Sequence, residues 1–569
     1  MKEQITELLS KLLGDFTREE IESFVEVPPN PDLGDYAFPC FRLAKTMRKA
    51  PQMIASELVD KINELLKESP INGIDTIKSE GAYLNFFLNK ELLTESILTE
   101  ASKENYGSSD ENEGKTICID YSSPNVAKNF HVGHLRTTII GNSLYKIFSK
   151  LGYHVERINH LGDWGTQFGK LIVAYKNWGD EETVKKSGVE ELMKLYVKFH
   201  EEAEMNPELN EEARSWFHKM ELGDEEALSI WQWFVDISLE EYKKTYALLG
   251  MDFDHFTGES FYRNMTDDIL KQLKDKNLTE ESEGALIVPL AEYDMPPCIV
   301  LKNDGSSIYA TRDIAAVLYR KKTYNFDKCL YVTGQEQKLH FKQVFKVVEL
   351  LGNEWAERDL VHIPYGLVSL GKAKLSTRNG NIIYAEDILK DAIAKIRETI
   401  EEKNPELPDK DEVARVVGVG AVLFNDLYNQ RIKDVAFDWD HLLNFDGETG
   451  PYVQYTYARC RSIIRKLTDY DENAKIDYSL ITDPASYALV KEISAYPTIV
   501  QEAANRFEPS VVARYVVDLA QAFNRFYTDN RINVEDTELR NARVKLVSVT
   551  GDIIKDALSL LGIGCVEQM

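Results

Sequence analysis

The chain has 569 residues, which is long for a single domain and predicts three or four. Hydrophobic residues make up 43% of it, enough for ordinary cores, so wholesale disorder is excluded. A formal net charge of −27 argues against a nucleic-acid partner, although a local basic patch would be sufficient for binding.

Targeting and redox features are also informative. No run of about 18 apolar residues occurs, so we expect no membrane span. The first segment, MKEQITELLSKLLGDF, mixes charges among its leucines, unlike a signal peptide. The six cysteines lie far apart without a CxxC pair, which is typical of reduced thiols and argues against a zinc site built from cysteines. These features predict a cytoplasmic protein.

Residues 1–105 are predicted to form a small α+β domain. Residues 50–66 carry apolar side chains at helical spacing, and residues 81–89 are typical of a strand. A polar stretch, residues 99–115, then separates this unit from the next, as a linker would.

A Rossmann-type domain is predicted over residues 112–390. Thr116–Tyr121 is dense in apolar residues, like a buried parallel strand, and apolar residues at helical period follow from Leu135 to Leu151. With a next strand at 153–159, this βαβ pattern predicts an α/β fold with a doubly wound parallel sheet.

Helices are expected to fill the rest of the chain. Long acidic helices over about 180–290 are interpreted as a helical insertion in the nucleotide fold, after which βα alternation resumes. We predict a helical connecting region at 391–450 and an all-α domain at 451–569.

Two histidines three positions apart, His131 and His134, stand where the first predicted strand leads into a helix. A metal pair would need a third ligand, and the glutamate and four-residue spacing of HExxH are absent. A purely structural pair at a helix start stays open. The third reading is a phosphate grip, because helix N-termini favour anions and imidazoles can donate hydrogen bonds. Gly133, which lacks a Cβ, would let a flat base approach the backbone.

The sequence here resembles a known family. HVGH, residues 131–134, resembles the HIGH signature of class I aminoacyl-tRNA synthetases, and KLSTRNG, residues 374–380, resembles their KMSKS signature. The segments SSPNVAKNFHVGHLR, GDWGTQFG, YATRDIAA, QKLHF and GPYVQYTYAR are similar to arginyl-tRNA synthetases, over essentially the whole chain.

This resemblance implies a reaction. L-Arginine and ATP would give arginyl-adenylate and diphosphate, and the arginyl group would pass to the terminal adenosine of tRNA(Arg). It also implies that Mg2+ accompanies ATP, that activation needs bound tRNA, and that the protein is a monomer. The sequence shows no dedicated metal ligands.

A guanidinium presents a planar fork of donors, so a selective pocket needs carboxylates and planar acceptors. By resemblance, the arginine side chain is held by Asp120, Tyr309, Asp313 and Gln337, and Asn125 orients the amino-acid end. Tyr309 and Asp313 lie four positions apart, on one face if a helix starts there. At position 120 the family often has the longer glutamate.

The resemblance also assigns residues to ATP and catalysis. Charge on the phosphates would be stabilised by the catalytic set His131, His134, Lys128 and Lys374. ATP contacts would come from His131, Gly133, His134, Lys374, Ser376 and Arg378. The chain departs from the KMSKS signature at one position: Thr377 stands where the signature has its second lysine. We infer that Lys128 takes over its phosphate contact, the alternative being a solvent-exposed lysine.

Two C-terminal stretches differ in charge from the rest of the chain, which is strongly acidic. Residues 455–466 interleave basic residues with tyrosines and contain no carboxylate, and residues 505–545 are close to charge balance. Basic side chains contact phosphates and aromatic faces stack on splayed bases. A bundle with solvated arginines explains the pattern equally well; the resemblance favours an anticodon-binding bundle, with tRNA contacts from Arg459, Arg461, Arg465, Arg525 and Arg531.

Three rival functions share some of these features. A tRNA-independent adenylyl transferase could share HxGH, but it has no use for a helical C-terminal domain of this size. A synthetase-like RNA-binding protein that has lost its chemistry would not need HVGH, Lys374 and the pocket carboxylates. A synthetase for another amino acid, such as lysine, is the weaker rival.

Overall fold

The computed structural model describes residues 1–569 except 31–32, 304–307, 371–372, 375–383, 468–470 and 472–473. It divides into two compact units. The first unit comprises Met1–Tyr106, Lys466–Ser494 and Ala522–Thr550, and the second Gly107–Arg465, Ala495–Gln521 and Gly551–Met569. Within the described residues, no helix is long and apolar enough to cross a membrane.

The first unit contains an antiparallel sheet of order β1-β3-β2, formed by Tyr36–Pro39, Tyr83–Leu88 and Ile74–Glu80. Helix α4 (Pro51–Glu68) begins with proline in its first turn, where a missing N–H costs nothing. Its residues Ile54, Leu58 and Ile62 recur every four positions and are fully or almost fully buried in the core beside the sheet. The predicted helix at 50–66 and strand at 81–89 are therefore present. The other helices of this part are α1 (Lys2–Ser10), α2 (Arg18–Phe24), η2 (Cys40–Arg42), α3 (Ala44–Met47) and α5 (Lys90–Ala101).

Asp35 explains why part of helix α20 (Pro484–Arg506) belongs to this first unit. The buried carboxylate lies 2.5 Å from the Nζ of Lys491 and accepts hydrogen bonds from the Tyr487 hydroxyl (3.1 Å) and the Leu88 N–H (2.9 Å). The helices α20, α21 (Ser510–Asp529) and α22 (Thr537–Leu560) each contribute residues to both units. The compact units thus divide the chain differently from the predicted domains 1–105 and 451–569.

The second unit is built on a five-stranded parallel sheet of order β11-β10-β4-β5-β6. Its strands are β4 (Thr116–Asp120), β5 (His154–Asn159), β6 (His255–Phe256), β10 (Lys328–Gly334) and β11 (Leu360–Tyr365). In chain order this is 3-2-1-4-5, so the order reverses between β4 and β10. Crevices at the carboxyl ends of strands beside such a switch point are where these sheets bind ligands.

Helices cover both faces of this sheet. Helices α13 (Tyr309–Tyr324) and α14 (Lys338–Leu350) share a core with Cys118, Ile158 and Cys329. Ile117 and Ile119 alternate with Cys118 and point to the opposite face, where α6 (Val132–Lys150) packs. The predicted doubly wound parallel sheet is confirmed.

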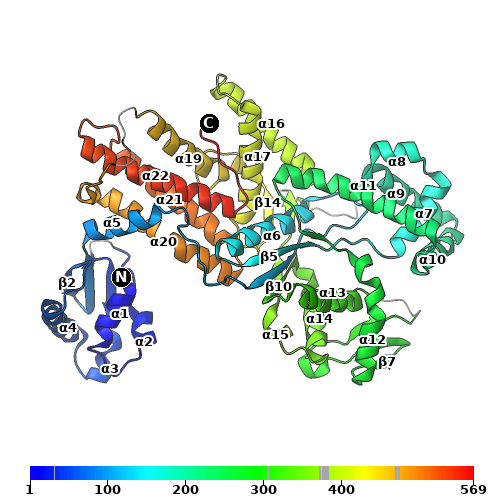
Figure 1. Ribbon diagram of the computed structural model, residues 1–569, viewed down its shortest axis with the longest axis horizontal. Helices are drawn as coiled ribbons and strands as arrows, with labels where there is room; N and C mark the ends of the chain where they lie inside the picture. The colour runs from blue at the N-terminus through cyan, green and yellow to red at the C-terminus, as the bar shows by residue number, and fades with distance from the viewer. Residues whose placement is uncertain (31–32, 304–307, 371–372, 375–383, 468–470, 472–473) are drawn as a thin grey trace. The chain divides into compact units, whose positions relative to one another are not determined.

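The predicted helical insertion over 180–290 is wrong in its extent. Helices α7 (Thr166–Trp178), α8 (Glu181–Ser187), α9 (Val189–Met205) and α10 (Glu208–Glu221) gather at one end of α11 (Glu225–Leu249), as Figure 1 shows. Gly250, at a φ of 66°, ends α11, and β6 then rejoins the central sheet. The remaining elements are η3 (Glu259–Met265), α12 (Thr266–Asp275) and an antiparallel sheet of β7 (Glu280–Ser282), β8 (Ala285–Val288) and β9 (Cys298–Leu301).

The region predicted to be helical after residue 390 also contains a strand. β14 (Val435–Phe437) pairs in parallel with β12 (Val368–Leu370), which pairs with β13 (Ala373–Lys374). This small sheet joins residues 435–437 to the segment that follows β11. The other elements are η4 (Ala291–Tyr293), η5 (Gln335–Gln337), α15 (Ala356–Asp359), α16 (Ala385–Lys403), α17 (Lys410–Leu427), α18 (Trp439–Leu442), α19 (Gly450–Arg465) and η6 (Tyr478–Ile481).

Candidate active site

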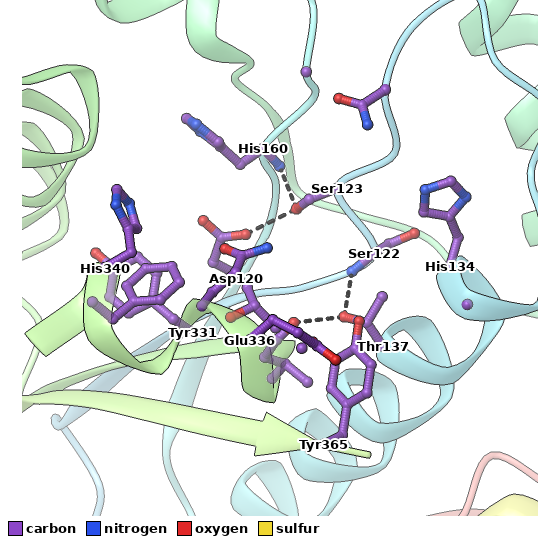
Figure 2. Close-up of a pocket in the computed structure, with 18 of the residues that line it drawn as sticks. Asp120, Ser122, Ser123, His134, Thr137, His160, Tyr331, Glu336, His340 and Tyr365 are labelled. Atoms are coloured by element: carbon purple, nitrogen blue, oxygen red, sulfur yellow. Dashed lines mark hydrogen bonds between the residues drawn. The ribbon is translucent and has the colours of Figure 1, made fainter. Parts of the chain in front are cut away.

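A cavity of about 650 Å³ lies at the carboxyl ends of β4 and β10, at the switch point of the sheet (Figure 2). Its walls come from the loop after β4, the first turn of α6, η3, the start of α13, the end of β10 with η5, and residues 365–368. The volume is that of a site for a small-molecule ligand. Most of the predicted side chains with described positions line it.

The loop after β4 is held in a strained conformation. Ser122, Ser123 and Ala127 have positive φ angles of 69°, 44° and 59°, which cost energy in residues other than glycine. Neighbouring elements fix them: the Ser122 hydroxyl lies 2.7 Å from that of Tyr246, and the Ala127 N–H donates to Ser238 Oγ (3.0 Å). Contacts within the protein thus hold the loop in place.

Asn125, in the same loop, lines the cavity and packs over Gly162. A Cβ at position 162 would lie 2.1 Å from Asn125 Oδ1, so only glycine permits this approach. The Asn125 carbonyl accepts a hydrogen bond from the buried Tyr242 hydroxyl (2.7 Å). The amide side chain is therefore placed at the cavity rim by backbone contacts.

His131 and His134 cap helix α6 reciprocally. His131 Nδ1 accepts from the Gly133 N–H (3.0 Å), and His134 Nδ1 accepts from the His131 N–H (3.3 Å). The rings stack with centroids 3.8 Å apart. Burial lowers the pKa of both rings, most strongly for His134, and the charge of Lys128 lowers both further. Each ring is therefore neutral, with its proton on Nε2.

The arrangement of His131 and His134 fits both a structural pair and a phosphate-binding pair. The histidines do stabilise the helix start, as a structural pair would, yet both line the cavity. Their Nε2–H groups stand beside a helix N-terminus, whose free N–H groups and dipole favour anions. A Cβ on Gly133 would lie 2.9 Å from His131 Cε1, so this glycine makes room for the imidazole ring.

Asp120 ends β4 beneath the cavity, but protein groups already engage both of its oxygens. Oδ2 lies 2.8 Å from a guanidinium nitrogen of Arg320, which is 1% exposed, and Oδ1 accepts from the Ser123 hydroxyl (2.9 Å). The Ser123 oxygen in turn accepts from the His160 N–H (3.1 Å), as Figure 2 shows. Asp120 thus neutralises an internal arginine, a partner that no local sequence pattern indicates.

Asp313 faces the cavity one turn into α13. Its Oδ2 lies 2.6 Å from His340 Nε2, and its Oδ1 lies 3.8 Å from His160 Nε2. Tyr309, on the same face and four residues earlier, is 55% exposed and also lines the cavity, as does Gln337 of η5. The structure confirms that a helix starts at Tyr309, so that Tyr309 and Asp313 lie one turn apart on the same helix.

Glu259 is a site residue that sequence reasoning missed. It begins η3, just after the return strand β6, and its Oε2 lies 3.0 Å from a guanidinium nitrogen of Arg312. Burial raises the pKa of Glu259 to about 8, against the lowering effect of Arg312, and the charges of Asp313 and Asp163 raise it further. A buried carboxyl with so high a pKa is largely protonated at neutral pH, and a further cation bound beside it would favour its ionised form.

The second signature is described only at its edges. Lys374 ends β13 and only its backbone is described; Ser376, Thr377 and Arg378 lie outside the described residues. The chain returns at Tyr384, whose backbone bridges His131. Lys128 is exposed and does not line the cavity.

The predicted tRNA contacts divide between the two units. In the second unit, Arg461 pairs with Asp552, Arg465 lies 3.9 Å from Glu567, and the Arg459 guanidinium lies 4.9 Å from the Tyr455 ring centroid. Arg525 and Arg531 belong to the first unit. Arg461 and Arg465 thus already have acidic neighbours within the protein.

Three domain families match the chain in order. The arginyl tRNA synthetase N-terminal domain matches residues 1–88, the catalytic domain of class I (R) tRNA synthetases residues 94–439, and the DALR anticodon binding domain residues 453–569. The middle match covers the whole cavity, and it defines the chain as a class I aminoacyl-tRNA synthetase.

Similar proteins show which member of this synthetase class the chain resembles. The chain is 50% identical to the arginine–tRNA ligase of Halothermothrix orenii, covering 100% of this chain and 99% of that one, and 53% identical to that of Clostridium perfringens, covering 98% and 97%. It also superposes on the arginyl-tRNA synthetase of Thermus thermophilus with a TM-score of 0.83 and 25% identity over both complete chains. The chain belongs to the arginyl-tRNA synthetase family and is a ligase.

Proposed function

We propose that the switch-point cavity is where this synthetase joins L-arginine to ATP and then to tRNA(Arg). The observation that carries the proposal is the arrangement of opposite chemistries in one cavity. The Asp313 carboxylate and the Glu259 carboxyl, which ionises when a cation binds, offer a site for a guanidinium, and the Nε2–H groups of His131 and His134 offer a site for phosphate. Arginine and ATP together need both.

The first step is a displacement at phosphorus. A carboxylate oxygen of arginine attacks the α-phosphorus of ATP, the bond to the bridging oxygen breaks, and diphosphate leaves. The two imidazole N–H groups and the α6 N-terminus stabilise the charge that builds on the phosphate oxygens. No protein nucleophile is needed, because positioning and electrostatics supply the rate.

The second step is acyl transfer. A ribose hydroxyl of the terminal adenosine attacks the carbonyl carbon of the adenylate, its proton passes to a phosphate oxygen of the departing AMP, and AMP leaves with the electrons of the broken C–O bond. Asn125 at the rim would orient the amino-acid end, and Tyr309 and Gln337 would close the side of the pocket. In the first step, Lys128 would supply the positive charge that Thr377 lacks; it does not line the cavity, but its charge lowers the pKa of both His131 and His134.

Magnesium accompanies ATP in this proposal. Among the residues that the structure describes, no group of three or more His, Cys, Asp or Glu side chains is placed to hold a metal ion. We therefore assign no residue to magnesium, and no step above depends on a protein ligand for it. We also propose that the enzyme acts as a monomer.

The experiment that tests this function is aminoacylation of tRNA(Arg) with each of the twenty amino acids, together with diphosphate exchange with and without tRNA. Arginine alone should be charged, and exchange should need tRNA. Charging of lysine would contradict the assigned specificity, and tRNA binding without exchange would identify an RNA-binding protein that has lost its chemistry.

Arginine binding should release a proton from Glu259. Its raised pKa, about 8, keeps the free carboxyl largely protonated at pH 7, whereas a bound guanidinium favours the ionised form and lowers that pKa. Affinity for arginine should therefore rise with pH and level off above about 8. Calorimetry in buffers of different ionisation enthalpy should count the proton at pH 7.

The matched variant for this prediction is Glu259→Gln, which keeps the shape and the contact with Arg312 but cannot titrate. It should bind arginine more weakly and release no proton. Other groups around Glu259 also titrate, since burial raises the pKa of Asp163, so Asp163→Asn serves as the control. Unchanged proton release in Glu259→Gln would assign the proton to another group.

A local basic surface should control tRNA binding despite the acidic whole. Binding releases counterions from the RNA, so affinity falls with salt, and each lost phosphate contact lowers the slope by about 1. Arg459→Gln combined with Arg465→Gln should weaken binding and flatten that slope. Arg461→Gln should do less, because its guanidinium is hydrogen-bonded to Asp552, whereas Arg465 lies 3.9 Å from Glu567, beyond hydrogen-bond distance.

Glutamates of the acidic insertion provide the control for this measurement. Glu201→Gln combined with Glu202→Gln removes two charges from α9 and should leave the slope almost unchanged. The measurement is the affinity for tRNA across a salt series for the parent and the variants, and it shows whether these arginines contact RNA phosphates. A parent-like slope in the arginine double variant would mean that α19 does not contact the RNA.

A further inference from the structure

Arg136 is a fully buried arginine that the proposed mechanism does not use. It lies on α6 two residues after His134, and its guanidinium donates four hydrogen bonds to backbone carbonyls of two other segments. Nη1 reaches Gly366 (2.8 Å) and Leu367 (3.0 Å), and Nη2 reaches Arg431 (3.1 Å) and Lys433 (2.8 Å).

The segments that it grips form one wall of the cavity. Gly366, Leu367 and Val368 line the cavity from the end of β11 to the start of β12, and β12 pairs with β13, which ends at Lys374. The chain at 431–435 backs this wall, because the Gly366 N–H donates to Arg431 O (2.9 Å) and the Val435 N–H to Leu367 O (2.9 Å). One side chain therefore ties the HVGH turn, the cavity wall and its backing strand together.

The wall leaves little room for adjustment. A Cβ on Gly366 would lie 2.7 Å from the Lys433 carbonyl and 2.8 Å from Asp434 Oδ1, so the two segments are in direct contact. Arg431 fixes the same wall from behind, donating to Pro364 O (2.6 Å) and Phe507 O (3.0 Å). A small shift of this backing would be transmitted to residues 366–368.

Packing alone does not require a charge at position 136. Burying a guanidinium is costly, and the nearest carboxylate, Asp426, lies 3.3 Å from Nε and is itself buried, so that burial raises its pKa to about 6. An apolar side chain would avoid both costs. Only a planar group with several donors can bind carbonyls of two segments at once and so fix the position of one segment relative to the other.

We propose that Arg136 is a positioning residue for the nucleotide: it holds the cavity wall at Gly366–Val368 in register with the His131–His134 turn. The inference rests on the proposed function, because it assumes that this side of the cavity receives ATP. Arg136 contacts no substrate in this proposal. It acts through the wall backbone, and the carboxylate side of the cavity, at Asp313 and Glu259, does not depend on it.

The test is Arg136→Lys, which keeps a positive charge beside Asp426 but cannot bind four carbonyls. A displacement of the wall by about 1 Å should lower kcat/KM for ATP in diphosphate exchange roughly 100-fold. The dissociation constant for arginine, measured by calorimetry without ATP, should stay within about twofold of the parent. A stability defect would lower both signals together.

Two further variants keep the proposal falsifiable. Arg136→Met with Asp426→Asn removes both buried charges together and so leaves no unpaired charge in the core, and the folded variant should still lose ATP turnover. Ser143→Ala, on the same helix, removes a buried hydrogen bond to Leu560 O (2.8 Å) without touching the wall, and should keep full turnover. Parent-like kcat/KM for ATP in folded Arg136 variants, or equal loss of arginine binding, would overturn the proposal. If the parent enzyme itself showed no diphosphate exchange, that result would instead contradict the proposed function.

Discussion

Asp313→Asn should weaken arginine binding by about two orders of magnitude, which corresponds to about 3 kcal/mol. The amide keeps the shape of the side chain, and its oxygen can still accept from His340 Nε2, so the local geometry should persist. What is lost is the negative charge facing the guanidinium in a partly buried site. The measurement is arginine affinity by calorimetry, with ATP affinity measured separately.

ATP binding is the internal control, because the nucleotide is proposed to sit at the histidine side of the cavity. It should change by no more than about twofold. His340→Gln is a second control, since it removes the ring beside Asp313 but keeps the carboxylate, and should cost much less than Asp313→Asn. Equal loss of ATP and arginine binding in Asp313→Asn would show that Asp313 supports the fold.

The central sheet could be predicted because its signal is local. Thr116–Asp120 is a short apolar run followed by a helix with apolar residues at helical period, and such a pattern has few alternatives. The return strand β6 could not be predicted in the same way. It has only two residues, His255 and Phe256, and neither stands out within an acidic helical region.

Missing β6 also explains why Glu259 was missed. Once the chain is known to rejoin the sheet at His255–Phe256, the next residues must lie at the carboxyl edge of the sheet, where ligands bind. Glu259 is three residues further on. Without that placement it is one acidic residue among many in a chain of net charge −27.

Internal partners are the other part of the site that the sequence could not supply. Asp120 is predictable from its position at a strand end, and it does line the cavity, but its ion pair with Arg320 joins residues 200 positions apart. The fork of Arg136 likewise reaches carbonyls about 230 and 295 positions away. Such contacts depend on how helices pack, and no local pattern encodes them.

The histidine pair shows how local geometry adds chemistry to a motif. The HxGH spacing identifies the residues, but only the reciprocal cap shows that each Nδ1 is an acceptor. Since the pKa of both rings is lowered, the neutral form with a proton on Nε2 persists below pH 6.5, the ordinary value for histidine. The rings therefore act as hydrogen-bond donors without carrying a charge.

His134→Ala should lower the rate of adenylate formation by about two to three orders of magnitude, as loss of one preorganised donor typically does. The variant also loses the cap on the His131 N–H, which should cost about 1 kcal/mol of stability. His134→Gln separates the two effects, because its amide can place an N–H near the position of Nε2 and should recover part of the rate. Single-turnover rates at saturating arginine and ATP, with unfolding midpoints measured in parallel, give both quantities.

The pH dependence provides the last check on this role. A donor that is already neutral should give a rate that does not change with ring protonation between about pH 6.5 and 8, because the lowered pKa moves that titration to more acidic solution. Saturating arginine removes the contribution of Glu259 to affinity in the same range. A rate in the parent enzyme that rises steeply from pH 8 to pH 6.5 would contradict the neutral form of the donor. A parent-like rate in His134→Ala would return His134 to a capping role alone.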